Sequence, residues 1–217
     1  MANLFFPEYT STIKFARADK PTFLECIHFY EEFLKHFSFF NPLDLNELNS
    51  YWEYCVLKKN TVIIGSGQVC ESMKFICKGA VKYYMEDNKG KYVMSFLTES
   101  NHCAPIKSFY FQTPSDLSAV CTEDVYGLQI SYKKFVQLLE DRPVYEKLFN
   151  ILIHENVTYL KTRLKTFQSM DANERFNLLM KENSEVLNRF SMLDIANYLG
   201  IKPETLSRLR RNERIKK

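Results

Sequence analysis

The spacing of apolar residues changes period twice along the chain. From residue 21 to about residue 54, apolar and aromatic residues recur every three or four positions, which is the period of packed helices. Residues 55–131 break into short runs rich in β-branched and aromatic side chains, which is typical of strands. A helical period returns at Tyr132. Residues 1 to about 22 have no clear period and are predicted to form an irregular arm.

The middle of the chain predicts an antiparallel barrel or jelly roll. Glycines separate its runs, and Asp87-Asn88-Lys89-Gly90 is typical of a hairpin turn. Several short strands with turns between them are common in closed or double-sheet antiparallel folds. The predicted strands are 61–64, 73–77, 80–84, 91–96, 119–121 and 125–126. The aromatic stripe on the preceding helices could form a ligand or partner surface, but we interpret it as core packing.

A long helix is predicted after Pro143, continuing without interruption to about Ser169. One stripe along it is apolar, and its last four members are spaced three, four and three residues apart, as in a coiled-coil seam. Such a seam must be buried, either on the barrel or on a second copy of the same helix. The stripe consists of Phe149, Ile153, Val157, Leu160, Leu164 and Phe167.

Residues 191–211 predict two short helices joined by a tight turn. Ser191 is a good N-cap residue, Gly200 can adopt the positive φ that ends a helix, and Pro203 suits a first helical turn. We therefore predict a helix-turn-helix, with a further helix over residues 171–182 packed beneath it. Positions i, i+3, i+4 and i+7 of the second helix share its outward face. They are Glu204, Ser207, Arg208 and Arg211.

The outward face of the second helix suits the major groove of DNA. Arg can pair with guanine, Glu can accept a hydrogen bond from cytosine, and Ser can contact a base or a phosphate. Lys202 adjoins the start of the helix, where free N–H groups favour phosphates. The alternative is a helical hairpin with a solvated charged face. The predicted DNA-binding residues are Lys202, Glu204, Thr205, Ser207, Arg208 and Arg211.

Charge and composition agree with this interpretation. Residues 191–217 contain seven Lys or Arg and three Asp or Glu, a balance of +4, whereas the whole chain carries +3. Basic charge concentrated in one region is typical of nucleic-acid binding. No apolar run approaches membrane-spanning length and no signal peptide opens the chain, so we expect a cytoplasmic protein without a membrane partner. The six cysteines show no close pairing and are expected to be reduced thiols.

The run IANYLGIKPETLSRLRR, residues 195–211, closely resembles the helix-turn-helix of the Crp/Fnr family of bacterial transcription regulators. Glu204, Ser207 and Arg208 match the E-x-x-S-R pattern with which members of the fumarate–nitrate regulator type read their operator. A second match, ISYKKFVQLLEDRP at residues 130–143, lies where these proteins leave their sensor barrel and enter a long helix. Two matches in the family's order are more specific than either alone.

The resemblance implies an α+β fold. An N-terminal antiparallel β-barrel or jelly roll of the cyclic-nucleotide-binding type would be followed by a long dimerisation helix and a C-terminal helix-turn-helix domain with little or no wing. The expected domains are residues 1–142, comprising N-terminal helices and sensor barrel, 143–169, the dimerisation helix, and 170–217, the DNA-binding domain. The implied partners are double-stranded DNA with a near-palindromic operator, a second copy of the chain, RNA polymerase and a small-molecule effector.

The stretch matching the family's phosphate cassette departs from the family pattern. Leu117-Ser118-Ala119 stands where cyclic-nucleotide-binding members have Arg-Ser/Thr-Ala, and no Gly-Glu pair precedes it. We therefore expect an effector other than cyclic AMP, of unknown identity. The candidate effector pocket consists of Phe96, Lys107, Ser108, Tyr110, Leu117 and Ser118.

Other sensor and enzyme chemistries are not favoured by the sequence. Only Cys26 precedes residue 50, whereas the oxygen-sensing branch of the family needs clustered N-terminal cysteines. The pair His102-Cys103 could ligate a haem iron, but we interpret it as part of a surface turn. His102 is the only His between residues 37 and 153, which disfavours a cupin-type metal enzyme. We expect no enzymatic activity, no cofactor and no metal site.

Two functional hypotheses follow. The first is a homodimeric DNA-binding regulator whose barrel senses an effector. The alternative is a ligand-independent DNA-binding regulator whose barrel serves only dimerisation or protein contacts.

Overall fold

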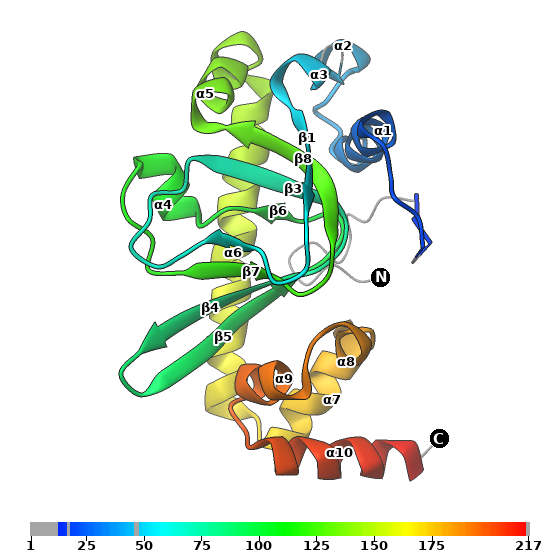
Figure 1. Ribbon diagram of the computed structural model, residues 1–217, viewed down its shortest axis with the longest axis vertical. Helices are drawn as coiled ribbons and strands as arrows, with labels where there is room; N and C mark the ends of the chain where they lie inside the picture. Colours follow the sequence, from blue (N-terminus) through cyan, green and yellow to red (C-terminus); the bar gives the residue numbers. More distant parts are fainter. Residues whose placement is uncertain (1–12, 17, 46–47, 216–217) are drawn as a thin grey trace.

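The computed structural model describes residues 13–16, 18–45 and 48–215. Figure 1 shows a β-barrel above a group of short helices, with one long helix running behind both. Most of the predicted N-terminal arm lies outside the described residues. None of the helices in the described ranges is both long and apolar enough to cross a membrane.

The N-terminal helices pack on the outside of the barrel. They are α1 (Phe23–Leu34), α2 (Pro42–Leu45) and α3 (Leu48–Tyr51). The α1 helix begins with a capping box, in which the Thr22 hydroxyl accepts from the Glu25 N–H and the Glu25 carboxylate accepts from the Thr22 N–H. The aromatic side chains of α1 are buried against the barrel, so the predicted aromatic stripe is core.

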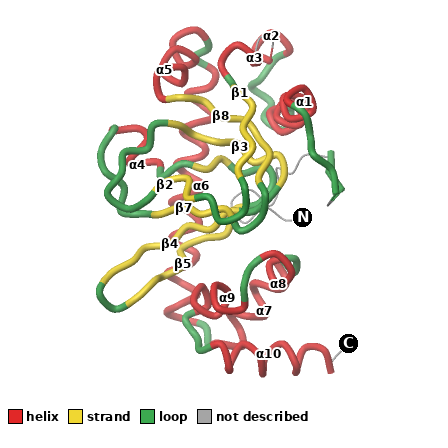
Figure 2. The backbone as a smooth tube through the Cα atoms, in the orientation of Figure 1, coloured by secondary structure: helices red, strands yellow, loops and turns green. Residues whose placement is uncertain are grey.

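Two antiparallel sheets form the barrel, as Figure 2 shows in yellow. Their strand orders are β1-β8-β3-β6 and β2-β7-β4-β5. The strands are β1 (Glu53–Leu57), β2 (Val62–Ile64), β3 (Ser72–Lys78), β4 (Val81–Asp87), β5 (Gly90–Leu97), β6 (His102–Cys103), β7 (Ser118–Cys121) and β8 (Val125–Ser131). The predicted antiparallel jelly roll is therefore confirmed. A short helix, α4 (Ile106–Phe111), lies between β6 and β7.

The β4–β5 hairpin forms at the predicted turn. Asp87 pairs with Gly90 in the ladder, and the Asp87 carboxylate accepts from the N–H groups of Lys89 and Gly90 at 2.7 and 3.2 Å. Further along, the register shifts between Tyr83 and Tyr84, so that β5 carries one extra residue, Met94. Ser95 and Phe96 beyond this bulge point to opposite faces of the sheet, as successive strand residues do.

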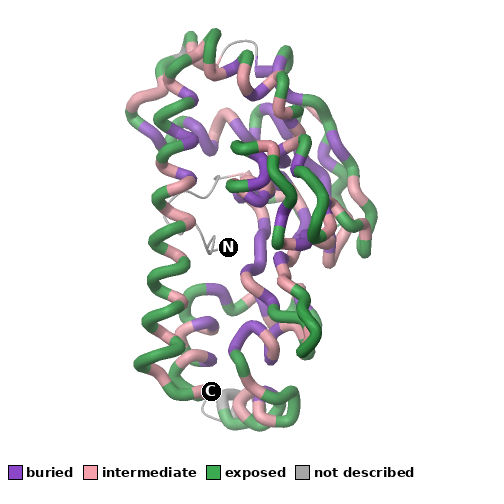
Figure 3. Tube along the Cα trace, turned by 90° about the vertical axis from the view of Figure 1, so that its left-hand side faces the viewer, coloured by how far each residue is buried: buried purple, intermediate pink, exposed green. Residues whose placement is uncertain are grey.

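The C-terminal half is helical. Its elements are α5 (Tyr132–Asp141), α6 (Val144–Ser169), α7 (Ala172–Glu182), α8 (Val186–Arg189), α9 (Met192–Leu199) and α10 (Pro203–Ile215). The long helix α6 has 26 residues and extends from the barrel to the short helices, and Figure 3 shows it along one side of the molecule. The expectation of little or no wing after α10 stays a prediction.

The molecule has two hydrophobic cores. The larger core joins the barrel with α1, α5 and the first half of α6. The smaller core holds α7 to α10 together and also contains three barrel residues, Ala80, Val93 and Phe96. The helix-turn-helix is therefore packed against the β4–β5 sheet rather than hanging free from α6.

Candidate DNA-binding surface and effector cavity

The helices α9 and α10 form the predicted helix-turn-helix. The Ser191 hydroxyl caps α9 by accepting from the Asp194 N–H at 3.0 Å. Gly200 ends α9 in the left-handed region at φ 65°, and the Ile201 N–H returns to the Ala196 carbonyl at 3.0 Å. Ile195, Leu199 and Leu206 are buried between the helices.

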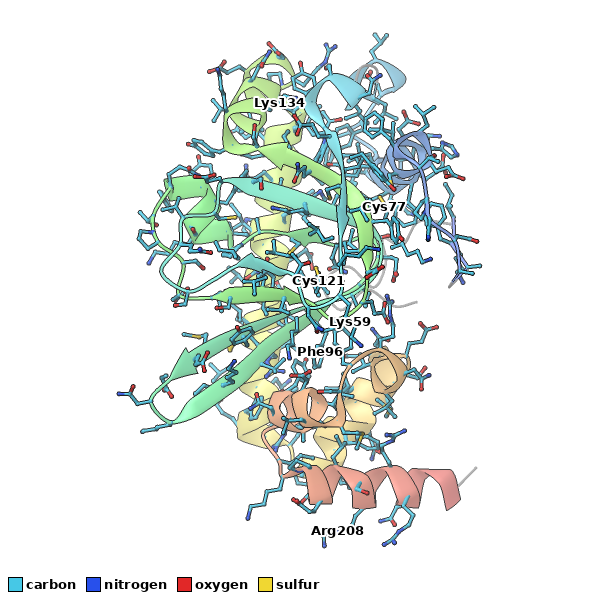
Figure 4. All side chains as sticks on the ribbon, viewed as in Figure 1. Lys59, Cys77, Phe96, Cys121, Lys134 and Arg208 are labelled. Atoms are coloured by element: carbon cyan, nitrogen blue, oxygen red, sulfur yellow. The ribbon has the colours of Figure 1, made fainter. Side chains whose placement is uncertain are left out.

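The predicted recognition residues lie on α10 or directly before it. Lys202, Glu204, Ser207, Arg208 and Arg211 are exposed, and Figure 4 shows Arg208 pointing away from the rest of the molecule. Thr205 is half-buried, and its hydroxyl lies 3.5 Å from an Arg208 guanidinium nitrogen. The structure thus gathers all six predicted residues at one end of the molecule.

Arg210 differs from its neighbours on α10. Its guanidinium contacts the Met192 sulfur at 2.8 Å and points back toward α9. It therefore braces the helix pair instead of extending the exposed face.

Polar contacts fix α9 to the hairpin β4–β5. The Asn197 side chain continues the edge of β5 by accepting from the Val93 N–H at 2.5 Å and donating to the Lys91 carbonyl. Lys82 of β4 pairs with Asp194 of α9 at 2.5 Å, and both side chains are largely buried. The sequence analysis did not identify these residues, because the partners are more than 100 positions apart.

A second polar contact joins α8 to the barrel. The Arg189 guanidinium contacts the carboxylates of Glu99 and Glu123, each at 2.6 Å. Burial would lower the pKa of Arg189, but the hydrogen bonds to the two carboxylates outweigh it, so the pKa is raised and the charge is kept.

The helix α6 also contacts α9 directly. The Tyr159 hydroxyl donates to the Met94 carbonyl of β5 at 3.1 Å and shares a 3.1 Å hydrogen bond with the Tyr198 hydroxyl. The Arg163 guanidinium lies 3.8 Å from the centre of the Tyr198 ring and donates to the Tyr198 carbonyl. Tyr159 therefore connects the barrel, the long helix and the helix-turn-helix.

A cavity of about 370 Å³ lies beside Tyr159, between the barrel wall, α4 and α6. Its volume falls within the range of small-molecule sites, about 300–1,000 Å³. Lys107, Ser108 and Leu117 of the candidate pocket line this cavity. Its apolar wall includes Met73, Met85, Met94, Leu97, Phe149 and Leu152.

The other three candidate pocket residues do not line this cavity. Tyr110 is 46% exposed and stacks on Phe149 from outside, and the Ser118 hydroxyl accepts from the Ser66 N–H. Phe96 is fully buried in the smaller core, with its ring centre 4.1 Å from that of Phe190 (Figure 4). Its assignment to the pocket was wrong, because Phe96 leaves β5 on the face opposite Ser95 and Leu97.

The pair His102-Cys103 is not part of a surface turn, and that interpretation was wrong. Both residues form β6, and the His102 ring lies among the rings of Tyr30, Phe33 and Phe75. Burial lowers the pKa of His102 to about 3 and raises the pKa of the Cys103 thiol to about 12. Within the described ranges, no cluster of three or more His, Cys, Asp or Glu side chains is arranged to hold a metal ion.

The predicted apolar stripe of α6 divides into two parts. Phe149 is buried against the barrel and Ile153 packs beside it. In contrast, Val157, Leu160, Leu164 and Phe167 are 42%, 47%, 60% and 43% exposed. Figure 3 shows this exposed stretch in the lower half of α6. The first part of the stripe thus belongs to the barrel core, and the second part is left largely uncovered by the described residues.

These features define a two-part protein in which a ligand-sized cavity in a β-barrel adjoins a helix-turn-helix. Residues 55–142 match the family model of the cyclic nucleotide-binding domain. FixK2 from Bradyrhizobium japonicum has a similar structure, with a TM-score of 0.68 and 16% identity over 76% of this chain and 85% of that chain. The regulator CLP from Xanthomonas campestris is also similar in structure, with a TM-score of 0.66 and 12% identity over 81% of this chain and 93% of that chain.

A putative transcriptional regulator of the Crp/Fnr family from Eubacterium rectale has a TM-score of 0.63 and 16% identity over 84% of this chain and 88% of that chain. A comparison with curated proteins gave no match. Residues 55–142 thus match a cyclic nucleotide-binding domain, and the chain has the fold of the Crp/Fnr regulators. The fold that the sequence resemblance implied is confirmed.

Proposed function

We propose that the protein is a sequence-specific, DNA-binding transcription regulator that acts as a homodimer and senses a small-molecule effector. The observation that carries the proposal is the outer face of α10. Glu204, Ser207, Arg208 and Arg211 stand exposed on a helix that a capped, glycine-terminated turn holds in place. Guanidinium, carboxylate and hydroxyl groups on one helix face match the donor and acceptor pattern of a major groove.

Each part of α10 has a separate role in this proposal. Arg208 and Glu204, one turn apart, reach base edges, and Ser207 and Thr205 contact bases or the adjacent backbone. Lys202 and the N-terminal turn bind phosphate, where the helix dipole favours negative charge. Arg211 extends the same face and contributes positive charge.

The dimer follows from the uncovered part of α6. Val157, Leu160, Leu164 and Phe167 form an apolar stripe that the described part of a single chain leaves 42–60% exposed. Pairing two such stripes removes apolar area from solvent, which stabilises association by about 25 cal/mol per Å². A two-fold axis along α6 places one α10 on each side, as a near-palindromic operator requires.

The cavity favours a regulator with an effector over the ligand-independent alternative. Its wall includes Met94 of β5 and Tyr159 of α6, and the Tyr159 hydroxyl contacts both the Met94 carbonyl and the Tyr198 hydroxyl of α9. An occupant can therefore change the position of α9. Cyclic AMP is not the effector in this proposal, because Leu117 stands in the cavity at the position of the arginine that would pair with its phosphate.

Selection from a pool of random duplexes tests the proposal. The purified protein should enrich a near-palindromic sequence with half-sites about one helical turn apart, and footprinting should show protection of both half-sites. Enrichment of no sequence, with equal retention of all duplexes at about 0.15 M salt, would contradict sequence-specific binding.

A further inference from the structure

The polar groups in the cavity fall into two kinds. Most already have partners within the protein: the Ser108 hydroxyl accepts from the Cys70 N–H at 2.9 Å, and the Ser115 hydroxyl donates to the Leu117 carbonyl at 2.8 Å. Asn101 donates to the Thr98 carbonyl at 3.1 Å. These contacts hold the three residues in the wall of the cavity.

Ser95 and Asn156 form the second kind, and the Nδ1 atom of the His102 ring, which also lines the cavity, is buried without a hydrogen-bond partner in the described part of the chain. Ser95 lines the cavity from β5 and Asn156 lines it from α6. Ser95 is only 4% exposed, and neither side chain hydrogen-bonds to any other residue in the described ranges. A buried hydroxyl without a partner costs free energy, so such groups are normally satisfied. The two side chains therefore mark where a ligand can supply hydrogen bonds.

The charges at the cavity cancel. Lys107 and Asp116 line it with exposed side chains of opposite sign, and neither forms an ion pair with another described residue. His102 also lines the cavity, but it is held neutral by its surroundings. A charged ligand would lose its hydration shell here without a net countercharge.

We propose that the cavity binds an uncharged, mainly apolar small molecule with one hydrogen-bonding group placed between Ser95 and Asn156. Its apolar part lies against the methionine and leucine side chains of the wall, which adapt to irregular shapes. The inference deepens the proposed function, since this occupant is the effector. Ser95 lies between Met94, which contacts Tyr159, and Phe96, which belongs to the core of the helix-turn-helix.

A pair of fluorescent probes tests the charge and polarity of the site. N-phenylnaphthylamine is uncharged, with one N–H, and anilinonaphthalene sulfonate has the same ring system with an added anion. We expect saturable binding of one uncharged probe per chain to the full-length protein. The sulfonate should bind at least about tenfold more weakly, because its charge must be desolvated.

Variants locate the bound probe. Leu117→Trp fills part of the cavity and should weaken binding at least about tenfold, since it removes the space for the rings. Met94→Trp is a second filling variant, and circular dichroism checks that both fold. Phe111→Ser is the matched surface control, since Phe111 is 67% exposed on α4 and lies outside the cavity. Asn156→Leu should weaken binding about two- to tenfold through loss of one hydrogen bond.

Each of the following results would overturn the proposal: no saturable binding of the uncharged probe, equal or tighter binding of the sulfonate, parent-like binding by both filling variants, or displacement of the probe by micromolar cyclic AMP. Operator binding by the same proteins without any probe is measured in parallel. If the parent protein binds its operator but not the uncharged probe, this inference alone is overturned, whereas absent operator binding by the parent protein contradicts the proposed function.

Discussion

Arg208 is the side chain through which base recognition can be tested most directly. It is exposed on the outer face of α10, and its contact within the chain, with Thr205, is long at 3.5 Å. We expect Arg208→Ala to weaken operator binding by about 1–3 kcal/mol and to relax discrimination at one G·C pair. Titration of operator duplexes with each base pair varied in turn, at one fixed salt concentration, measures both effects.

Lys133→Ala supplies the control for Arg208→Ala. It also removes one positive charge, but from an exposed position on α5, at the end of the molecule far from α10 (Figure 1). Operator affinity should be unchanged in this variant. Equal affinity losses in both variants would indicate a general charge effect and would contradict a base contact by Arg208.

His102 gives the folded protein a specific pH dependence. Burial lowers its pKa to about 3, compared with 6.5 for an unperturbed His. Below pH 6.5 the unfolded chain therefore binds a proton that the folded chain does not, and stability falls as the pH falls. The contribution of His102 is fully present above that pH and is lost progressively toward pH 3, by about 1.4 kcal/mol per unit.

Urea unfolding of the parent and of His102→Phe measures this contribution. Between about pH 6 and about pH 5 the parent should lose about 1 kcal/mol more unfolding free energy than the variant. Phe is chosen because the surrounding rings of Tyr30, Phe33 and Phe75 accommodate an aromatic side chain. Parallel pH profiles for the two proteins would show that the folded state protonates His102 readily.

Individual residues also show the limits of sequence-based prediction at this scale. The outward face of α10 was predictable because a helix fixes the relative position of residues three and four apart. Phe96 was assigned to the wrong face because the face of a strand residue depends on its register, and the bulge at Met94 is not visible in the sequence. Ser95 and Asn156 come together from elements 61 positions apart, which local patterns cannot indicate.

At the scale of elements, the long and strongly periodic segments were predicted well. The structure has α6 at Val144–Ser169 and α7 at Ala172–Glu182, close to the predicted bounds. The strands β1 and β6 were not predicted. In β1 only Cys55 of the five residues is buried, and the strand directly follows the aromatic helices, so no alternating pattern marks it. The strand β6 has only two residues, which is too short to show a pattern. Tertiary pairing, with β8 and β3 respectively, makes these segments strands.

The uncovered half of α6 gives a prediction about assembly. Leu164 is 60% exposed on the stripe and lies outside the cavity, so a change there does not alter the cavity wall. Leu164→Glu would place two carboxylates near each other across a two-fold axis without partners. We expect this variant to be monomeric by light scattering and to bind its operator more weakly, since each half-site then binds alone.

Leu43→Glu is the matched control for the assembly prediction. Leu43 is 71% exposed on α2, which contacts the first turn of α6 at the end opposite Leu164, so a glutamate there should leave both mass and operator affinity unchanged. A dimeric Leu164→Glu variant would contradict the proposed seam and would place the dimer contact on another surface.

At the scale of the whole molecule, barrel and helix-turn-helix share a core. Phe96 of β5 lies between Phe190 and Tyr198, with ring centres 4.1 and 4.9 Å away. The Arg189 and Asn197 contacts surround this apolar centre with hydrogen bonds. The wall of the cavity and the support of α9 are therefore opposite faces of one strand, so a change on one face can reach the other.

This arrangement predicts a selective effect of Phe96→Ala. Removing a buried ring lowers the free energy of unfolding by about 3–5 kcal/mol. The packing lost with Phe96 belongs to the core that holds α7 to α10 together. In hydrogen exchange, the amides of α9 should lose protection while those of β3 and β8 keep it, because the larger core does not include Phe96. Phe75→Ala is the matched control, since Phe75 is equally buried but belongs to the larger core, and its protection loss should centre on β3 and β8. If Phe96→Ala instead loosened barrel and helix-turn-helix equally, the molecule would be one cooperative unit, and β5 would not act as the boundary between two cores.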